Sequence, residues 1–170
     1  NAGNGNDTFI WNLGDGLDTI TDGGGHDKIS FGPGIRFEDL SFSLVSGHRS
    51  LKITVKGDET QGIILNNHMG NQPDYKIEDL YFYDGSIVHL SEIPLTLRQN
   101  STQGEILYLS DNGDTVYAGS GDDYIDGGMG DDTIIGGKGW DVINGSSGKN
   151  TYIWNQGDGF DTITCDYESD

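Results

Sequence analysis

Large apolar residues recur every nine positions in the last third of the chain. Ile125, Ile134 and Ile143 each stand two places after an aspartate and follow a run rich in glycine. Three residues that alternate around one apolar side chain are typical of a very short strand, and glycine-rich runs between them are typical of turns. The pattern predicts short stacked strands whose apolar residues form one continuous seam: Ile125, Ile134, Ile143, Tyr152 and Ile163.

The complete frame is Gly-Gly-x-Gly-x-Asp-x-apolar-x, and it is strongest near the C-terminus. Six segments follow it there: 109–117, 118–126, 127–135, 136–144, 145–153 and 156–164. The inner copies fit nearly every position, whereas Asn150 replaces the aspartate in one outer copy and Trp154–Asn155 is inserted before the last. If successive strands lie on opposite sides of a flattened coil, turns two repeats apart stack on the same edge.

The same frame occurs at the N-terminus, in residues 2–10, 13–21 and 22–30. In addition, residues 6–21 and 149–164 are nearly the same sequence. We therefore expect the end of one repeat block in residues 1–30 and most of another in 109–170. We also expect the chain to be a piece of a longer protein.

Residues 31–108, between the two blocks, have a different pattern. Alternating apolar residues separated by short turns predict antiparallel strands there. The strands are expected at 40–46, 50–56 and 62–68, with two more inside 76–93. Hairpin turns are expected at Gly47–His48 and Asp84–Gly85. The predicted organisation is all-β, with two repeat blocks on either side of a small β-rich linker.

The composition excludes several classes of partner. The chain has 28 acidic and 9 basic residues, a net charge of −19, so nucleic acid is an unsuitable partner because phosphate contacts need Lys and Arg. Only 33% of residues are hydrophobic, and no apolar run approaches the ~20 residues of a transmembrane helix. The single cysteine, Cys165, rules out an internal disulfide. A cation is the natural partner of so acidic a chain.

The aspartates of the repeats would repel one another in a stack. Strands in a sheet are ~4.8 Å apart, and two carboxylates about 5 Å apart repel by roughly 1 kcal/mol in water and ~3 kcal/mol at an effective dielectric of 20. A divalent cation between them removes this repulsion. Carboxylates and turn carbonyls are the ligands that Ca²⁺ prefers, whereas Mg²⁺ demands a more rigid octahedron.

The nonapeptide frame resembles the repeats of the RTX (repeats-in-toxin) family, also called haemolysin-type calcium-binding repeats. The arrangement of two blocks with a linker is similar to that of multi-block RTX toxins such as adenylate cyclase toxin. The resemblance implies a parallel β-roll with several Ca²⁺ ions between turns two repeats apart. It also implies export by a type I secretion system and folding outside the cell.

The resemblance also implies ligands: the sixth-position side chains of both turns, with first- and third-position carbonyls from one turn and second- and fourth-position carbonyls from the other. The first site joins Asp114 and Asp132 with Leu109, Asp111, Gly128 and Gly130. The second joins Asp123 and Asp141 with Ala118, Ser120, Gly137 and Gly139. The third joins Asp132 and Asn150 with Gly127, Met129, Ser146 and Gly148. The fourth joins Asp141 and Asp161 with Gly136, Lys138, Gly157 and Gly159. The fifth, in the first block, joins Asp7 and Asp27 with Ala2, Asn4, Gly23 and Gly25.

Two functions agree with these features. The first is a calcium-binding module of a secreted toxin or exoprotein, which assists secretion and folds on extracellular Ca²⁺. The alternative is an adhesion or receptor-binding module of a large RTX adhesin, with a host-cell surface as its partner. The four histidines are scattered without HExxH spacing, and no GxSxG occurs, so we expect no enzymatic activity.

Overall fold

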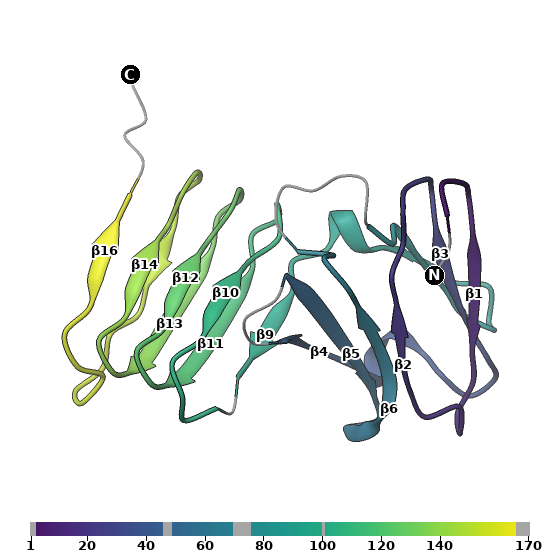
Figure 1. Ribbon diagram of the computed structural model, residues 1–170, viewed down its shortest axis with the longest axis horizontal. Helices are drawn as coiled ribbons and strands as arrows, with labels where there is room; N and C mark the ends of the chain where they lie inside the picture. The colour runs from purple at the N-terminus through teal and green to yellow at the C-terminus, as the bar shows by residue number, and fades with distance from the viewer. Residues whose placement is uncertain (1–2, 46–48, 70–75, 100, 166–170) are drawn as a thin grey trace. The chain divides into compact units, whose positions relative to one another are not determined.

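The computed structural model (Figure 1) describes residues 3–45, 49–69, 76–99 and 101–165. Regular structure in these residues is nearly all β-strand, apart from two short 3₁₀ turns, η1 (Phe37–Asp39) and η3 (Leu90–Glu92). None of the described helices is long and apolar enough to cross a membrane. The chain divides into two compact units, and each is described separately. Unit 1 comprises Asn1–Phe42 and Ser50–Ile93, and unit 2 comprises Ser43–Arg49 and Pro94–Asp170.

Unit 2 is a coil in which successive strands alternate between two parallel sheets. One sheet contains β9 (Thr96–Arg98), β11 (Thr115–Ser120), β13 (Thr133–Lys138) and β15 (Thr151–Tyr152). The other contains β10 (Ile106–Tyr108), β12 (Tyr124–Asp126), β14 (Val142–Asn144) and β16 (Thr162–Thr164). Figure 1 shows the strands of the second sheet as successive rungs. Paired residues in adjacent repeat strands, such as Val116 and Ile134, are two repeats apart, which is the stacking that the period predicts.

The apolar seam of unit 2 consists of two rows, one on each sheet. Leu107, Ile125 and Ile143 form one row, and Leu97, Val116 and Ile134 form the other; all six are buried. The prediction of one seam was wrong in this respect, because strands nine residues apart lie on opposite sheets. It was also wrong at the end, because Ile163 pairs with Ile143 but remains 44% exposed on the last strand.

Unit 1 contains the same kind of coil with a hairpin inserted. β1 (Thr8–Trp11), β3 (Lys28–Phe31) and β7 (Asp79–Tyr81) form parallel pairs, and β8 (Ile87–His89) is antiparallel to β7. In the other sheet, β2 (Leu17–Ile20) is parallel to β6 (Asp58–Leu65), which is antiparallel to β5 (Ser50–Val55). β4 (Leu40–Val45) neighbours β5 and is divided by sequence between the units.

Turn chemistry sets the two hairpins of unit 1. Lys56 and Gly57, between β5 and β6, both have positive φ, which matches the twist of a two-residue hairpin. The predicted turn at Asp84–Gly85 is present between β7 and β8, with Gly85 at φ 89°. The turn predicted at Gly47–His48 includes residues outside the described ranges.

The core of unit 1 is larger and more aromatic than that of unit 2. Phe31 stacks on Phe82 at 5.4 Å between ring centroids and meets Trp11 edge to face at 6.1 Å. Unit 1 also buries many aliphatic side chains: Ile29, Leu51, Ile53, Ile63, Leu65, Ile77 and Leu80. The coil of unit 1 therefore has a hydrophobic core in addition to its stacked glycine-rich turns.

The structural division differs from the sequence-based one into residues 1–30, 31–108 and 109–170. β6 and β7, from the segment predicted as a linker, pair in parallel with β2 and β3 of the first repeats. β9 and β10, from the other end of that segment, pair in parallel with β11 and β12. Both ends of the segment therefore continue the coils.

Candidate calcium-binding turns

The sixth-position side chains of unit 2 form two files, one for each set of stacked turns. In the first, the backbone N–H of Asp114 donates to Asp132 Oδ1 at 2.8 Å, and that of Asp132 donates to Asn150 Oδ1 at 2.9 Å. The second file repeats this geometry, with Asp123 N to Asp141 Oδ1 at 2.9 Å and Asp141 N to Asp161 Oδ1 at 3.2 Å. Each carboxylate therefore fixes the backbone of the turn two repeats before it.

These hydrogen bonds use only one of the two carboxylate oxygens of most of these aspartates. Asp123, Asp132 and Asp141 are at most 2% exposed, and in each the Oδ2 atom is buried with no hydrogen-bond partner among the described residues. Asp114 differs, because its Oδ2 accepts hydrogen bonds from the backbone N–H and the hydroxyl of Ser110. A buried carboxylate oxygen without a donor is costly, so a proton or a cation must neutralise it.

The electrostatics of the protein disfavour the charged state of these aspartates. Burial, with a smaller contribution from neighbouring carboxylates, raises the pKa of Asp123 and of Asp132 to about 7. The pKa values of Asp114 and Asp141 are also raised, again mainly by burial. Hydrogen bonds from backbone N–H groups lower these pKa values, but by less than burial raises them. The sites therefore provide carboxylate oxygens that have no positive charge beside them among the described residues.

Glycine allows the turns to stack closely enough for these contacts. Gly128 has φ 75°, and a Cβ atom on it would lie 2.6 Å from the Ser110 carbonyl oxygen of the underlying turn. Gly139 forms a parallel bridge with Gly159, and its N–H donates to Asp158 O at 2.7 Å. Close contacts of this kind join the turns of all four predicted sites in unit 2: 109–114 with 127–132, 118–123 with 136–141, 127–132 with 145–150, and 136–141 with 156–161. The assignment of individual carbonyl ligands stays a prediction.

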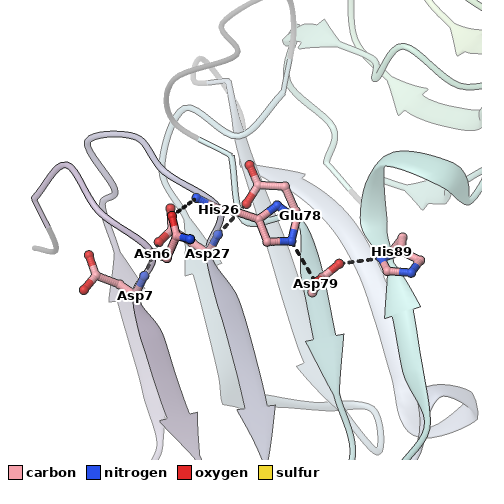
Figure 2. Close-up of polar contacts among 7 residues, drawn as sticks. All are labelled: Asn6, Asp7, His26, Asp27, Glu78, Asp79 and His89. Carbon is pink, nitrogen blue, oxygen red and sulfur yellow. Dashed lines mark hydrogen bonds and ion pairs between the residues drawn. The ribbon is translucent and has the colours of Figure 1, made fainter.

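A third file, in unit 1, begins with the predicted pair. Asp7 N donates to Asp27 Oδ1 at 2.6 Å, and Asp27 N donates to Glu78 Oε2 at 2.6 Å (Figure 2). Gly23 and Gly25 pack against the turn that contains Asn4, while Ala2 lies outside the described residues, and the carbonyl ligands assigned to these residues stay a prediction. Asp18, although it occupies the sixth position of its repeat, lies exposed in β2 and outside this file.

A family model of the RTX calcium-binding nonapeptide repeat, in four copies, matches residues 12–37, 108–143 and 117–152. Both units carry RTX calcium-binding repeats. Comparison with curated proteins gave no match. The matched residues include the turns of both files in unit 2 up to residue 152. The oxygen-rich and acidic ligands that these turns offer are the kind that Ca²⁺ prefers.

Two glutamates outside the recognisable RTX repeats continue the files. Glu78 ends the file of unit 1, and Glu105 N donates to Asp123 Oδ1 at 2.8 Å in unit 2. Glu105 is 6% exposed, and its Oε2 is buried without a partner among the described residues. Its spacing of 18 residues from Asp123 equals two repeats and could have identified it. Glu78 lies 51 residues after Asp27, and no spacing rule identifies it from sequence.

The fifth position of the RTX frame also has a structural role that sequence reasoning missed. The side-chain oxygen of Asp122 accepts from Trp140 N at 2.9 Å, and that of Asp131 accepts from Lys149 N at 2.8 Å. Asn6 accepts from His26 N in the same way in unit 1. In these three repeats, a polar fifth-position side chain therefore ties the turn to the one stacked on it.

The fold brings together two histidines that are scattered in the sequence. Asp79, which is nearly buried, contacts His26 Nε2 at 3.1 Å through one carboxylate oxygen and His89 Nδ1 through the other (Figure 2). The hydrogen bond to Asp79 raises the pKa of His89. The two rings flank one carboxylate, which gives this buried acid two partners next to the file of unit 1.

Proposed function

We propose that this chain is an extracellular folding module in which Ca²⁺ ions lie between consecutive carboxylates of each file. The observation that carries the proposal is the buried Oδ2 atom of Asp123, Asp132 and Asp141, which has no donor among the described residues. These atoms recur at the spacing of the stacked turns, next to backbone carbonyls. A Ca²⁺ ion takes 6–8 oxygen ligands in flexible geometry, and such turns supply them.

The ions then determine whether unit 2 is folded. The site exists only when turns two repeats apart are stacked, so the free energy of ion binding becomes free energy of folding. Without the ion, carboxylates of one file lie in line with raised pKa values and repel one another. With the ion, that repulsion becomes attraction between each turn and the next.

The secretory role follows from this dependence. In a cytosol poor in Ca²⁺, the acidic repeats would remain unfolded and could pass through a type I secretion system as an extended chain. In millimolar extracellular Ca²⁺ they would fold. We assign the module to a secreted toxin or exoprotein on the basis of its RTX repeats and its charge of −19, and we assign it a binding role with no catalysis.

Circular dichroism and native mass spectrometry test this function. In excess chelator the 170-residue chain should lose the β signal of unit 2, regain it in millimolar Ca²⁺ with several ions bound, and fail to regain it in equal Mg²⁺. A chain that is fully folded in chelator, or that binds no Ca²⁺ when folded, would contradict the proposal.

One observation favours the alternative role in adhesion. Trp140 and Phe160 are 70% and 81% exposed and form an edge-to-face pair on unit 2. Exposed aromatic rings are enriched at binding surfaces. If adhesion is the function, the Ca²⁺-loaded chain should bind a host glycan or cell surface, and Trp140→Ala should weaken that binding without changing the ion count. No binding across a broad glycan and cell panel would weigh against this role.

A further inference from the structure

Three carboxylates meet at the start of unit 1. One oxygen atom from each of Asp7, Asp22 and Asp27 lies within 4.8 Å of the other two. Because Ca²⁺–oxygen bonds are about 2.3–2.6 Å long, two ligand oxygens on opposite sides of one ion are about 5 Å apart. One ion can therefore contact all three carboxylates with little rearrangement of the chain.

Hydrogen bonds hold two of these acids in place by one oxygen each. Asp27 Oδ1 accepts from Asp7 N, and Asp22 Oδ2 accepts from Gly24 N at 2.7 Å. Their other oxygens, Asp27 Oδ2 and Asp22 Oδ1, are buried without a hydrogen-bond donor among the described residues. Asp27 is 0% exposed and Asp22 is 4% exposed, so water does not compensate them.

The two buried acids act on each other directly. Burial raises the pKa of Asp27, and the nearby Asp22 carboxyl raises it further, followed by the charge of Glu78. Two neighbouring buried carboxyl groups, each with an oxygen that has no donor among the described residues, require a positive charge to neutralise them. This observation is independent of the nonapeptide pattern, which assigns no ligand role to the side chain of Asp22.

Asp22 distinguishes this place from the turns of unit 2. It occupies the first position of its repeat, where Gly127 and Gly136 stand in the repeats that fit the frame fully. Those repeats can offer only a backbone carbonyl at that position, whereas Asp22 adds a charged oxygen. The number of charged ligands is one of the properties that set Ca²⁺ affinity in proteins.

We propose that Asp7, Asp22 and Asp27 together hold one Ca²⁺ ion, and that this site fills at lower free Ca²⁺ than the sites of unit 2. The identity of the ion rests on the proposed function, whereas the third carboxylate and the order of filling are new. Unit 1 would then be loaded first as the Ca²⁺ concentration rises.

A Ca²⁺ titration that reports each unit separately tests the proposal. Trp11 is buried in unit 1, while Trp140 and Trp154 are exposed in unit 2, so Trp140→Phe with Trp154→Phe leaves Trp11 as the only tryptophan. In this 170-residue background, the fluorescence transition of Trp11 should occur at lower free Ca²⁺ than the circular dichroism transition of unit 2. Asp22→Asn should raise the Trp11 midpoint at least about fivefold, because the site loses one charged ligand.

Asp18→Asn is the matched control, since it removes the same charge from an exposed aspartate of unit 1. It should leave the Trp11 midpoint within about twofold of the parent, as expected for surface changes away from a site. An unchanged or lower midpoint in Asp22→Asn would show that Asp22 and Asp27 share a proton instead of an ion, and would overturn the proposal. If the parent chain shows no Ca²⁺ response at all, the proposed function itself fails, which is a distinct result.

Discussion

Units 1 and 2 use the same contact between a carboxylate and the backbone of a preceding turn, but they embed it in different surroundings. Unit 1 has one such file beside an aromatic core built from Trp11, Phe31 and Phe82. Unit 2 has two files and a smaller core of aliphatic side chains, mainly the two rows. The difference separates two sources of stability. Hydrophobic burial supports unit 1 whether or not an ion is bound, whereas unit 2 depends on neutralisation of its aspartates.

Removal of Ca²⁺ should have the largest effect and should affect the units unequally. In excess chelator, amides of β11 to β14 should exchange with solvent almost freely, because their carboxylate files then repel. Amides of β5 and β6 should keep most of their protection, because buried aliphatic side chains hold that hairpin. Hydrogen exchange read by mass spectrometry measures both, and equal loss in the two units would remove the distinction.

Truncation of the apolar rows should sharpen the contrast within unit 2. Ile134→Ala should destabilise Ca²⁺-loaded unit 2 by about 2–5 kcal/mol, because it opens a cavity in a small core. Ile163→Ala, at a position already 44% exposed, should cost less than about 1 kcal/mol. Urea unfolding in saturating Ca²⁺ compares them, and similar costs would show that β16 is more deeply packed than the structure has it.

Removal of one carboxylate charge at a time should show which positions in a file contribute most to Ca²⁺ binding. Asp132 lies between Asp114 and Asn150, whereas Asp161 ends its file, so Asp132→Asn should lower the number of bound Ca²⁺ ions more than Asp161→Asn. Combining Asp132→Ala with Asp141→Ala should lower it further. Isothermal titration calorimetry gives the stoichiometry, and unchanged ion counts would refute the assigned register.

Acidity should act on unit 2 in opposite directions with and without Ca²⁺. Burial raises the folded-state pKa of Asp123 and Asp132 to about 7, above the value of an exposed aspartate, so the ion-free fold binds more protons than the unfolded chain. Its stability should therefore be greatest at low pH and fall as the pH rises through 7. In Ca²⁺, protons compete with the ion, so affinity should increase over the same range.

Circular dichroism in metal-free buffer, with a parallel Ca²⁺ titration at pH 6 and pH 8, measures both trends. Asp123→Asn together with Asp132→Asn provides the control, since it removes two of the groups with raised pKa values and should make the ion-free profile less steep. A stability of the ion-free chain that rises towards pH 8 would contradict the assigned cause.

The parallel β-roll and the pairs Asp114–Asp132 and Asp123–Asp141 came from the resemblance to RTX repeats, while the nine-residue period was sufficient to predict short stacked strands and the stacking of turns two repeats apart. These features are local and repeat, so sequence spacing determines them directly. The same reasoning could not identify Glu78 or Asp22, because their places depend on the path of an inserted hairpin and on a turn that departs from the frame. It also treated the apolar residues as one row, since spacing alone does not say on which sheet a strand lies.

Glu78 and Glu105 show that a turn of the coil does not need the glycine and aspartate residues of the repeat sequence. The Glu78 carboxylate accepts from the backbone N–H of Asp27, and the backbone N–H of Glu105 donates to the carboxylate of Asp123, although neither glutamate is surrounded by the glycine frame. The coil thus extends beyond the residues that carry the nonapeptide motif. At its ends, a sequence without the motif keeps the stacking geometry. If repeats were added to or removed from such a coil, the strands next to Glu78 and Glu105 are where a new segment could be joined. The register of every later turn would then be preserved.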